Sequence, residues 1–283
     1  MSIELTVVSL GAGVQSTTVV LLAAAGKIEP MPDCAIFADT GSEPTAVYDH
    51  LEWLTPRLPF PVHIVRAWEK YGKPSITAPL GQLIMGAARG ENKVGSHARP
   101  PFFTLNTDGS KGMIRRQCTG DFKIDPINKK IRELLGLKPR QRWPKKEVVE
   151  QWMGISTDEA MRMKPAQQSA IRMRWPLIEL HMSRQDCLSW LAAEGYPRPP
   201  KSACTFCPFH SDAEWRRLRD TDSSGWAEAV DLDRAIRSGL TSKSLSGALF
   251  LHPSCVPLEE VDFDADDGQL NLFVNECEGV CGL

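Results

Sequence analysis

The opening of the chain joins a short apolar run to a turn of small residues, and this combination constrains the fold more than any other feature. Residues 5–10 (LTVVSL) are rich in Val; they lead into Gly11-Ala12-Gly13 and then into a helix-compatible segment beginning near Gln15 and Ser16. A strand, a small-residue turn and a helix N-terminus in this order direct backbone N–H groups at one place, which suits a phosphate. Glycine in such a turn can equally serve backbone geometry alone. The segment lacks both G-x-x-x-x-G-K-[ST] and the dinucleotide glycine spacing, so we predict neither an ordinary P-loop nor a dinucleotide site.

A second strand end follows closely in the sequence. Residues 33–38 form an apolar run that predicts a buried strand, and Asp39-Thr40-Gly41 follows where that strand ends. In open α/β sheets, ligands bind outside the carboxyl ends of the strands. We therefore expect the small-residue turn and Asp39-Thr40-Gly41 to face one crevice.

Apolar runs alternate with segments of helical period along most of the chain. Strands are predicted over 4–10, 33–38, 61–66 and 147–155, and helices over 15–25, 44–56, 80–88, 126–136, 156–163, 183–194, 211–220 and 225–239. This alternation predicts a doubly wound α/β fold with a mostly parallel sheet and a mainly helical C-terminal part. We expect an α/β domain over 1–200 with an insertion at about 67–112, and a helical segment over 201–283 that ends in a flexible tail. A long insertion of this kind is often a substrate lid rather than sheet.

Composition narrows the class of protein. The 283 residues are 42% hydrophobic and 24% charged, as in ordinary globular proteins. No apolar run approaches the roughly 18 residues of a membrane span, and the N-terminus lacks the pattern of a secretory signal, so we expect a cytoplasmic protein without a membrane partner. The net charge of −2 argues against a uniformly basic nucleic-acid binder.

Charge is nevertheless distributed unevenly. Basic residues are concentrated between positions 111 and 146, at Lys111, Arg115, Arg116, Lys123, Lys129, Lys130, Arg132, Lys138, Arg140, Arg142, Lys145 and Lys146. Acidic residues are concentrated near the end of the chain, at Glu259, Glu260, Asp262, Asp264, Asp266 and Asp267. The basic stretch is either a solvated face or a rim for a phosphorylated or polynucleotide substrate.

Eight cysteines in a chain expected in the cytoplasm favour metal binding or catalysis over structural disulfides. Cys204 and Cys207 form a C-x-x-C followed by Pro208, and two thiolates at this spacing can converge on one metal. A single pair is half of a metal site. Cys34 and Cys187 lie in apolar, periodic segments, and we expect them to be inert core residues.

The sequence resembles the PP-loop superfamily, and specifically its phosphoadenylyl-sulfate (PAPS) and adenylyl-sulfate reductase branch. The S-G-G-x-D-S loop of the family falls on residues 11–16, and its D-T-G falls on residues 39–41. In the loop, Gly11 replaces a serine, Ala12 a glycine and Gln15 an aspartate. Residues 175–186 resemble the family's P-L-x-x-W…D stretch, and the resemblance extends over residues 4 to about 210.

The resemblance implies an adenine-nucleotide site for ATP or an adenylyl sulfate, with Mg²⁺ as a candidate companion ion. The residues that it assigns to this site are Gly11, Ala12, Gly13, Gln15, Ser16, Asp39, Thr40, Gly41 and Gly154, with Arg115 and Arg116 neutralising further anionic charge. Arg162 resembles the substrate-facing arginine of the family, and Lys123 is in register with a family lysine that neutralises anionic charge. We assign Arg162 and Lys123 to catalysis.

The same family suggests which cysteine joins the C-x-x-C. Residues 115–126 resemble the C-C-x-x-[RK]-K-[VI]-x-P stretch of adenylyl-sulfate reductases, which hold a [4Fe–4S] cluster, and Cys118 falls on the first cysteine. Thr119 stands where the second would be. The implied ligands are therefore Cys118, Cys204 and Cys207 with an open fourth position. Zinc is the alternative, completed by His210 or another cysteine, and a chain without metal is the third reading.

The C-terminus carries two further cysteines, Cys277 and Cys281. Cys281-Gly282-Leu283 resembles the E-C-G-[IL]-H tail whose thiolate attacks the sulfur of the bound nucleotide in these reductases, although the histidine is absent. Cys281 is accordingly assigned as the catalytic nucleophile. The alternative is a chance pair of cysteines in a flexible end.

Three functions are consistent with these motifs. The first is a sulfonucleotide reductase that uses a thiol reductant protein as partner. The second is an ATP-dependent sulfurtransferase that takes sulfur from a donor and thiolates a tRNA or another nucleic-acid base. The third is a non-catalytic sensor of an adenine nucleotide, suggested by the changes at Gly11 and Gln15. A homodimer is compatible with each of them.

Overall fold

The computed structural model of the chain describes residues 3–91, 99–239 and 247–264. A five-stranded sheet lies at its centre, and its strands are β1 (Leu5–Leu10), β2 (Cys34–Asp39), β3 (Val62–Arg66), β6 (Val149–Met153) and β7 (Ile171–Arg174). Their order is β3-β2-β1-β6-β7, and each neighbouring pair is parallel. The prediction of an α/β fold built on a parallel sheet is confirmed.

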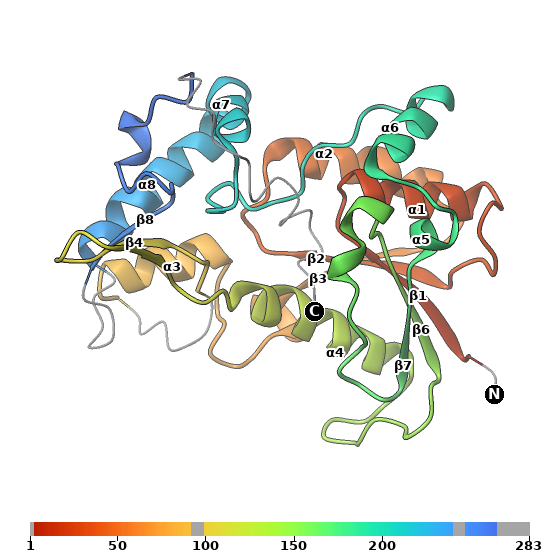
Figure 1. Ribbon diagram of the computed structural model, residues 1–283. Helices are drawn as coiled ribbons and strands as arrows, with labels where there is room; N and C mark the ends of the chain where they lie inside the picture. Colours follow the sequence, from red (N-terminus) through yellow and green to blue (C-terminus); the bar gives the residue numbers. More distant parts are fainter. Residues whose placement is uncertain (1–2, 92–98, 240–246, 265–283) are drawn as a thin grey trace.

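Helices cover both faces of this sheet (Figure 1). The helices on one face are α1 (Val14–Ala24), α2 (Thr45–Leu54), α5 (Pro176–Glu179) and α6 (Arg184–Ala193), and α4 (Asp125–Leu134) covers the other. Successive side chains of a strand point to opposite faces. In β1, Val8 accordingly packs in the core under α1, whereas Val7 packs in the core under α4. β2 and β3 extend the sheet on one side of β1, and β6 and β7 extend it on the other side. The strand order therefore reverses between β1 and β6.

The insertion and the C-terminal segment pack together as a second part of the molecule. Its helices are α3 (Leu80–Ala88), α7 (Asp212–Thr221) and α8 (Ser223–Gly239), and these share one hydrophobic core. A small antiparallel sheet joins them in the order β5-β4-β8, with β4 (Phe103–Leu105), β5 (Lys111–Met113) and β8 (Ala248–Phe250). The insertion at about 67–112 was expected to be a lid rather than sheet. This expectation is wrong for the part of the insertion that forms β4 and the start of β5. The sequence separates β4 from β8 by more than 140 residues, and their pairing is a tertiary effect.

The predicted elements are found with small shifts at their ends, with one exception. Residues 156–163 were expected as an α-helix and instead contain the 3₁₀ helix η4 (Thr157–Arg162). β7 lies in a stretch for which no strand is predicted. Single turns complete the chain, namely η1 (Thr55–Arg57), η2 (Ala67–Tyr71), η3 (Gly120–Ile124) and η5 (Leu258–Glu260).

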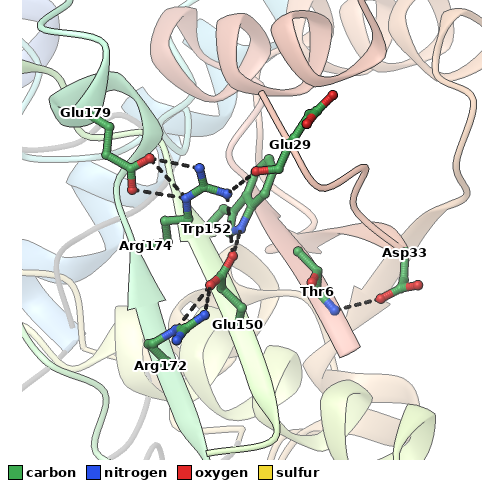
Figure 2. Close-up of polar contacts among 8 residues, drawn as sticks. All are labelled: Thr6, Glu29, Asp33, Glu150, Trp152, Arg172, Arg174 and Glu179. Atoms are coloured by element: carbon green, nitrogen blue, oxygen red, sulfur yellow. Dashed lines mark hydrogen bonds and ion pairs between the residues drawn. The ribbon is translucent and has the colours of Figure 1, made fainter. Parts of the chain in front are cut away.

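Polar contacts hold β7 at the edge of the sheet (Figure 2). The buried Glu150 of β6 accepts hydrogen bonds from Trp152 Nε1 (2.8 Å) and Arg172 Nε (3.1 Å). Arg174 lies over the Trp152 ring, 4.7 Å from its centroid, and pairs with Glu179 at 2.8 Å. Arginine side chains on β7 thus replace the apolar run by which a strand is normally recognised.

Within the part of the chain that the structure describes, no helix combines the length and apolar character that a membrane span requires.

Candidate functional site

The loops after β1 and β6 meet at the carboxyl edge of the sheet, where the strand order reverses. Ala12 adopts a φ of 61°, in the left-handed region that favours glycine, which is the residue that the resembled loop carries here. A Cβ added to Gly154 would lie 2.7 Å from the backbone nitrogen of Ser16. Only glycine therefore lets the loop after β6 approach the start of α1 so closely. This edge is the place where open α/β sheets bind ligands.

The N-terminus of α1 has no side-chain cap. Gly13 is its N-cap, no side-chain hydrogen bond satisfies the first turn, and the first turn contains no acidic residue. The Ser16 hydroxyl accepts a hydrogen bond from Gly11 N (3.1 Å) and donates to Gly13 O (3.3 Å), so it closes the loop on itself. A buried helix N-terminus without a cap favours an anion.

Gln15 connects this helix end to two other segments. Its Nε2 donates to Ser156 Oγ (3.4 Å), and its Oε1 accepts from Nη1 of Arg184 (3.3 Å), the first residue of α6. Burial lowers the pKa of Arg184. Arg184 lies in the stretch 175–186 that resembles the family, but no role is predicted for it, because its contact with Gln15 joins residues 169 positions apart.

Arg162 lies on η4, beside the loop that contains Ser156. Its guanidinium is 2.8 Å from the Glu159 carboxylate, which is buried. Burial raises the pKa of Glu159. Arg162 and Glu159 therefore form a pair next to the segment that Gln15 contacts.

Asp39 builds the turn that ends β2. Its Oδ1 accepts hydrogen bonds from Gly41 N (2.7 Å) and from the Tyr48 hydroxyl (2.9 Å), and its Oδ2 pairs with Arg66 Nε at 2.8 Å. Gly41 has a φ of 73°, and a Cβ there would lie 2.6 Å from a carbon of Pro79. The Asp39 carboxylate thus bonds to groups of the protein itself.

Thr40 joins this turn to the cysteines. Its Oγ1 lies 3.2 Å from Cys204 Sγ and donates to Glu43 Oε1, also at 3.2 Å. Lys123 Nζ is 3.5 Å from the same carboxylate oxygen. The Glu43 side chain is fully buried, and burial followed by the Glu43 charge raises the pKa of Cys204.

One cavity is lined by the three cysteines that were predicted as metal ligands. Its lining residues are Thr40, Leu80, Pro100, Pro101, Arg116, Cys118, Thr119, Lys123, Cys204, Phe206 and Cys207. The structure thus brings the three predicted metal ligands to the same cavity as two predicted cations, whereas Arg115 is not part of the lining. Lining one cavity does not make a metal site, however. Among the described residues, no group of three or more His, Cys, Asp and Glu side chains is arranged to hold a metal ion.

His210, the candidate fourth ligand for zinc, contacts the backbone of the C-x-x-C segment and Glu214. Its Nε2 lies 2.9 Å from the carbonyl oxygen of Cys204, and its Nδ1 lies 3.9 Å from Glu214 Oε2. Burial lowers the pKa of His210. The ring therefore supports the C-x-x-C backbone in the structure.

Glu228 of α8 holds the two loops of the site together. Its carboxylate accepts hydrogen bonds from Ser42 Oγ (2.9 Å) and Thr205 Oγ1 (2.7 Å), and Thr205 N donates to Ser42 O (2.8 Å). The loop after β2 and the C-x-x-C loop are consequently linked by both backbone and side chain. No sequence motif surrounds Glu228, and its contacts with Ser42 and Thr205 are seen only in the folded structure.

The other cysteines differ from those of the cavity. Cys34 and Cys187 are buried in the core, and burial raises their pKa values to about 11 and about 12. Cys277 and the predicted nucleophile Cys281 lie outside the described residues.

Comparisons with known proteins give a likeness among solved structures. No protein-family model matches the chain, and no curated protein matches it. Among solved structures, the chain is similar to the crystal structure of PAPS reductase from Candida auris in complex with phosphate, with a TM-score of 0.40 and 14% sequence identity over 68% of this chain and 74% of that chain. The likeness is one of fold, and the site described above is defined by its own contacts.

Proposed function

We propose that the chain binds an adenine nucleotide at the carboxyl edge of its central sheet and acts on sulfur in the adjoining cysteine cavity, as a sulfonucleotide reductase-like enzyme. One observation carries this proposal: Thr40, from the turn that ends β2, lies 3.2 Å from Cys204 Sγ. A single side chain therefore belongs to both the sheet edge and the cysteine cavity. A ligand that spans the two would place its nucleotide at the edge and its sulfur at the thiols.

The sheet edge supplies the groups that a nucleotide phosphate needs. The uncapped N-terminus of α1 offers backbone N–H groups and the positive end of the helix dipole. Gln15 stands where the resembled loop carries an aspartate. Arg184, which donates a hydrogen bond to Gln15, adds a guanidinium beside the loop. The replacement of an acid by a neutral amide beside an arginine favours a more anionic ligand.

The cysteine cavity supplies cations and thiols. Arg116 and Lys123 line it, and they would neutralise the sulfo group of an adenylyl sulfate. Cys118, Cys204 and Cys207 are the residues that would hold a [4Fe–4S] cluster, or zinc as the alternative, since thiolates are the donors that both prefer. When bound, such a group would supply a Lewis-acidic metal beside the reacting sulfur. The donor type suits it, although the side chains are not gathered into a metal-binding arrangement.

Reductase chemistry also requires a nucleophile, and we assign it to Cys281. Its thiolate would attack the sulfur of the sulfonucleotide, the S–O bond to the nucleotide would break, and adenosine phosphate would leave. A thiol reductant would then attack the cysteine sulfur, form a disulfide and release sulfite.

A second function is favoured by the number of thiols in the cavity. Three cysteines line it, and the described lining contains no fourth. A metal group bound there would keep an open position for a sulfur atom, which suits an ATP-dependent sulfurtransferase acting on a nucleic-acid base.

Product analysis distinguishes these functions. Reduced protein incubated with adenylyl sulfates and a dithiol should release sulfite, whereas ATP, sulfide and bulk tRNA should give thiolated nucleoside if the second function holds. Cys204→Ser should remove either product, because a hydroxyl is a far weaker metal ligand than a thiolate. Cys255→Ser is the control, since Cys255 is a buried cysteine that does not line the cavity. Nucleotide binding without either product would contradict both enzymatic functions and support the sensor.

A further inference from the structure

The loop between α4 and β6 concentrates positive charge on the surface. Residues 137–147 read LKPRQRWPKKE and contain five cations and one carboxylate, in a chain whose net charge is −2. The side chains of all five cations are exposed; they belong to Lys138, Arg140, Arg142, Lys145 and Lys146. We call these five residues the basic loop. Within the described residues, none of the five forms an ion pair.

The basic loop is held in shape from its inner side. Arg132 of α4 donates hydrogen bonds to the carbonyl oxygens of Lys138 (3.2 Å) and Gln141 (2.6 Å), and its guanidinium lies 5.2 Å from the centroid of the Trp143 ring. Arg140 adopts a φ of 63°, in the left-handed region that an arginine rarely occupies. The half-buried Arg132 thus organises the backbone of the loop, and the five cations of the basic loop are exposed to solvent. A surface preorganised in this way loses less entropy on binding.

The basic loop lies at the amino end of the sheet (Figure 1). The proposed nucleotide site lies at the opposite, carboxyl edge. The basic loop leads into β6, which begins at Val149 and ends at Met153, immediately before Gly154. Five strand residues at about 3.3 Å each separate the two ends by on the order of 16 Å. A single nucleotide at the carboxyl edge does not reach across this distance, but a polymer does.

We propose that the basic loop is a binding surface for the phosphate backbone of an RNA. Five exposed cations spread over nine residues match a ligand with repeated negative charges better than one with a single anionic group. An RNA is favoured over an acidic protein because the same molecule could present a base at the cysteine cavity while its backbone contacts the loop. The choice of RNA rests on the second proposed function, but binding of RNA to the basic loop does not require the nucleotide site to be correct.

A charge-reversal experiment tests the surface. In the first variant, Arg140→Glu, Arg142→Glu and Lys145→Glu are combined. The matched control combines Lys27→Glu, Arg89→Glu and Arg217→Glu, which are exposed cations elsewhere in the molecule. Both variants change the net charge equally. Binding of bulk tRNA to the full chain is measured as a function of salt concentration, and folding of each variant is checked by its thermal unfolding.

The loop variant should bind tRNA at least about tenfold more weakly than the wild-type chain, with a salt dependence that is shallower by about one unit for each cation that contacts a phosphate. The control should stay close to wild type. Equal losses in the two variants would overturn the proposal, because general charge would then explain the binding. The same holds if wild-type chain fails to bind tRNA at moderate salt, or if poly-glutamate competes as well as RNA. Nucleotide-induced thermal stabilisation, measured in parallel, reports on the nucleotide site separately.

Discussion

At the residue scale, some of the motif residues found in the sequence contact the protein itself. Asp39 accepts bonds from Gly41, Tyr48 and Arg66, and it is almost fully buried. Its role in the structure is to fix the turn that places Thr40 against Cys204. The sequence predicts that this acid matters, but it does not reveal its partners.

Asp39→Asn should therefore destabilise the chain even without nucleotide. The amide removes the charge that pairs with Arg66 and turns one acceptor into a donor facing that guanidinium. Because Arg66 is partly exposed, the loss is expected to be about 2 kcal/mol, measured by urea unfolding. Asp49→Asn is the control: Asp49 is exposed on the same helix as Tyr48 and should change stability by less than about 0.5 kcal/mol. Equal stability of the two variants would show that Asp39 does not hold the turn.

At the scale of the elements, hydrophobic period predicts most of the α/β domain. The helix over 80–88 and the strands of the sheet centre are found where the apolar pattern places them, because burial on a fixed face determines both. β7 was missed because arginines anchored by Glu150 and Glu179 replace its apolar pattern. β4 and β8 were missed because each has three residues and gains its partner from a distant part of the chain. Arg184 and Glu228 also make contacts with residues far away in the sequence, so their roles were missed in the same way.

The close approach of two elements at the carboxyl edge of the central sheet gives a test by glycine substitution. Gly154→Ala would place a Cβ 2.7 Å from the Ser16 backbone, which cannot move without displacing α1. We expect a loss of stability of about 1–3 kcal/mol and weaker adenine-nucleotide binding. Gly120→Ala is the control, because the added Cβ meets no atom within 4 Å and the backbone is not left-handed. The packing argument fails if Gly154→Ala unfolds at the same temperature and binds nucleotide as wild type does.

At the scale of the whole molecule, two parts with separate cores share one site. The parallel sheet supplies the turns after β1, β2 and β6, and the C-x-x-C loop is attached to the second part through Glu228 on α8. The hydrogen bond from Thr205 N to Ser42 O crosses the boundary. A nucleotide bound at the sheet edge should therefore change access to the cysteines.

The most direct measurement of this claim is the rate at which each cysteine is alkylated, followed by mass spectrometry in the presence and absence of an adenylyl sulfate. At a nucleotide concentration of about ten times Kd, Cys118, Cys204 and Cys207 should react about tenfold more slowly, because the occupied site excludes the reagent. Cys255 serves as the internal reference, and GTP should protect less than the adenine nucleotide. Unchanged rates at the three cavity cysteines under saturating nucleotide, or an equal slowing of Cys255, would contradict the account of a shared nucleotide and sulfur site.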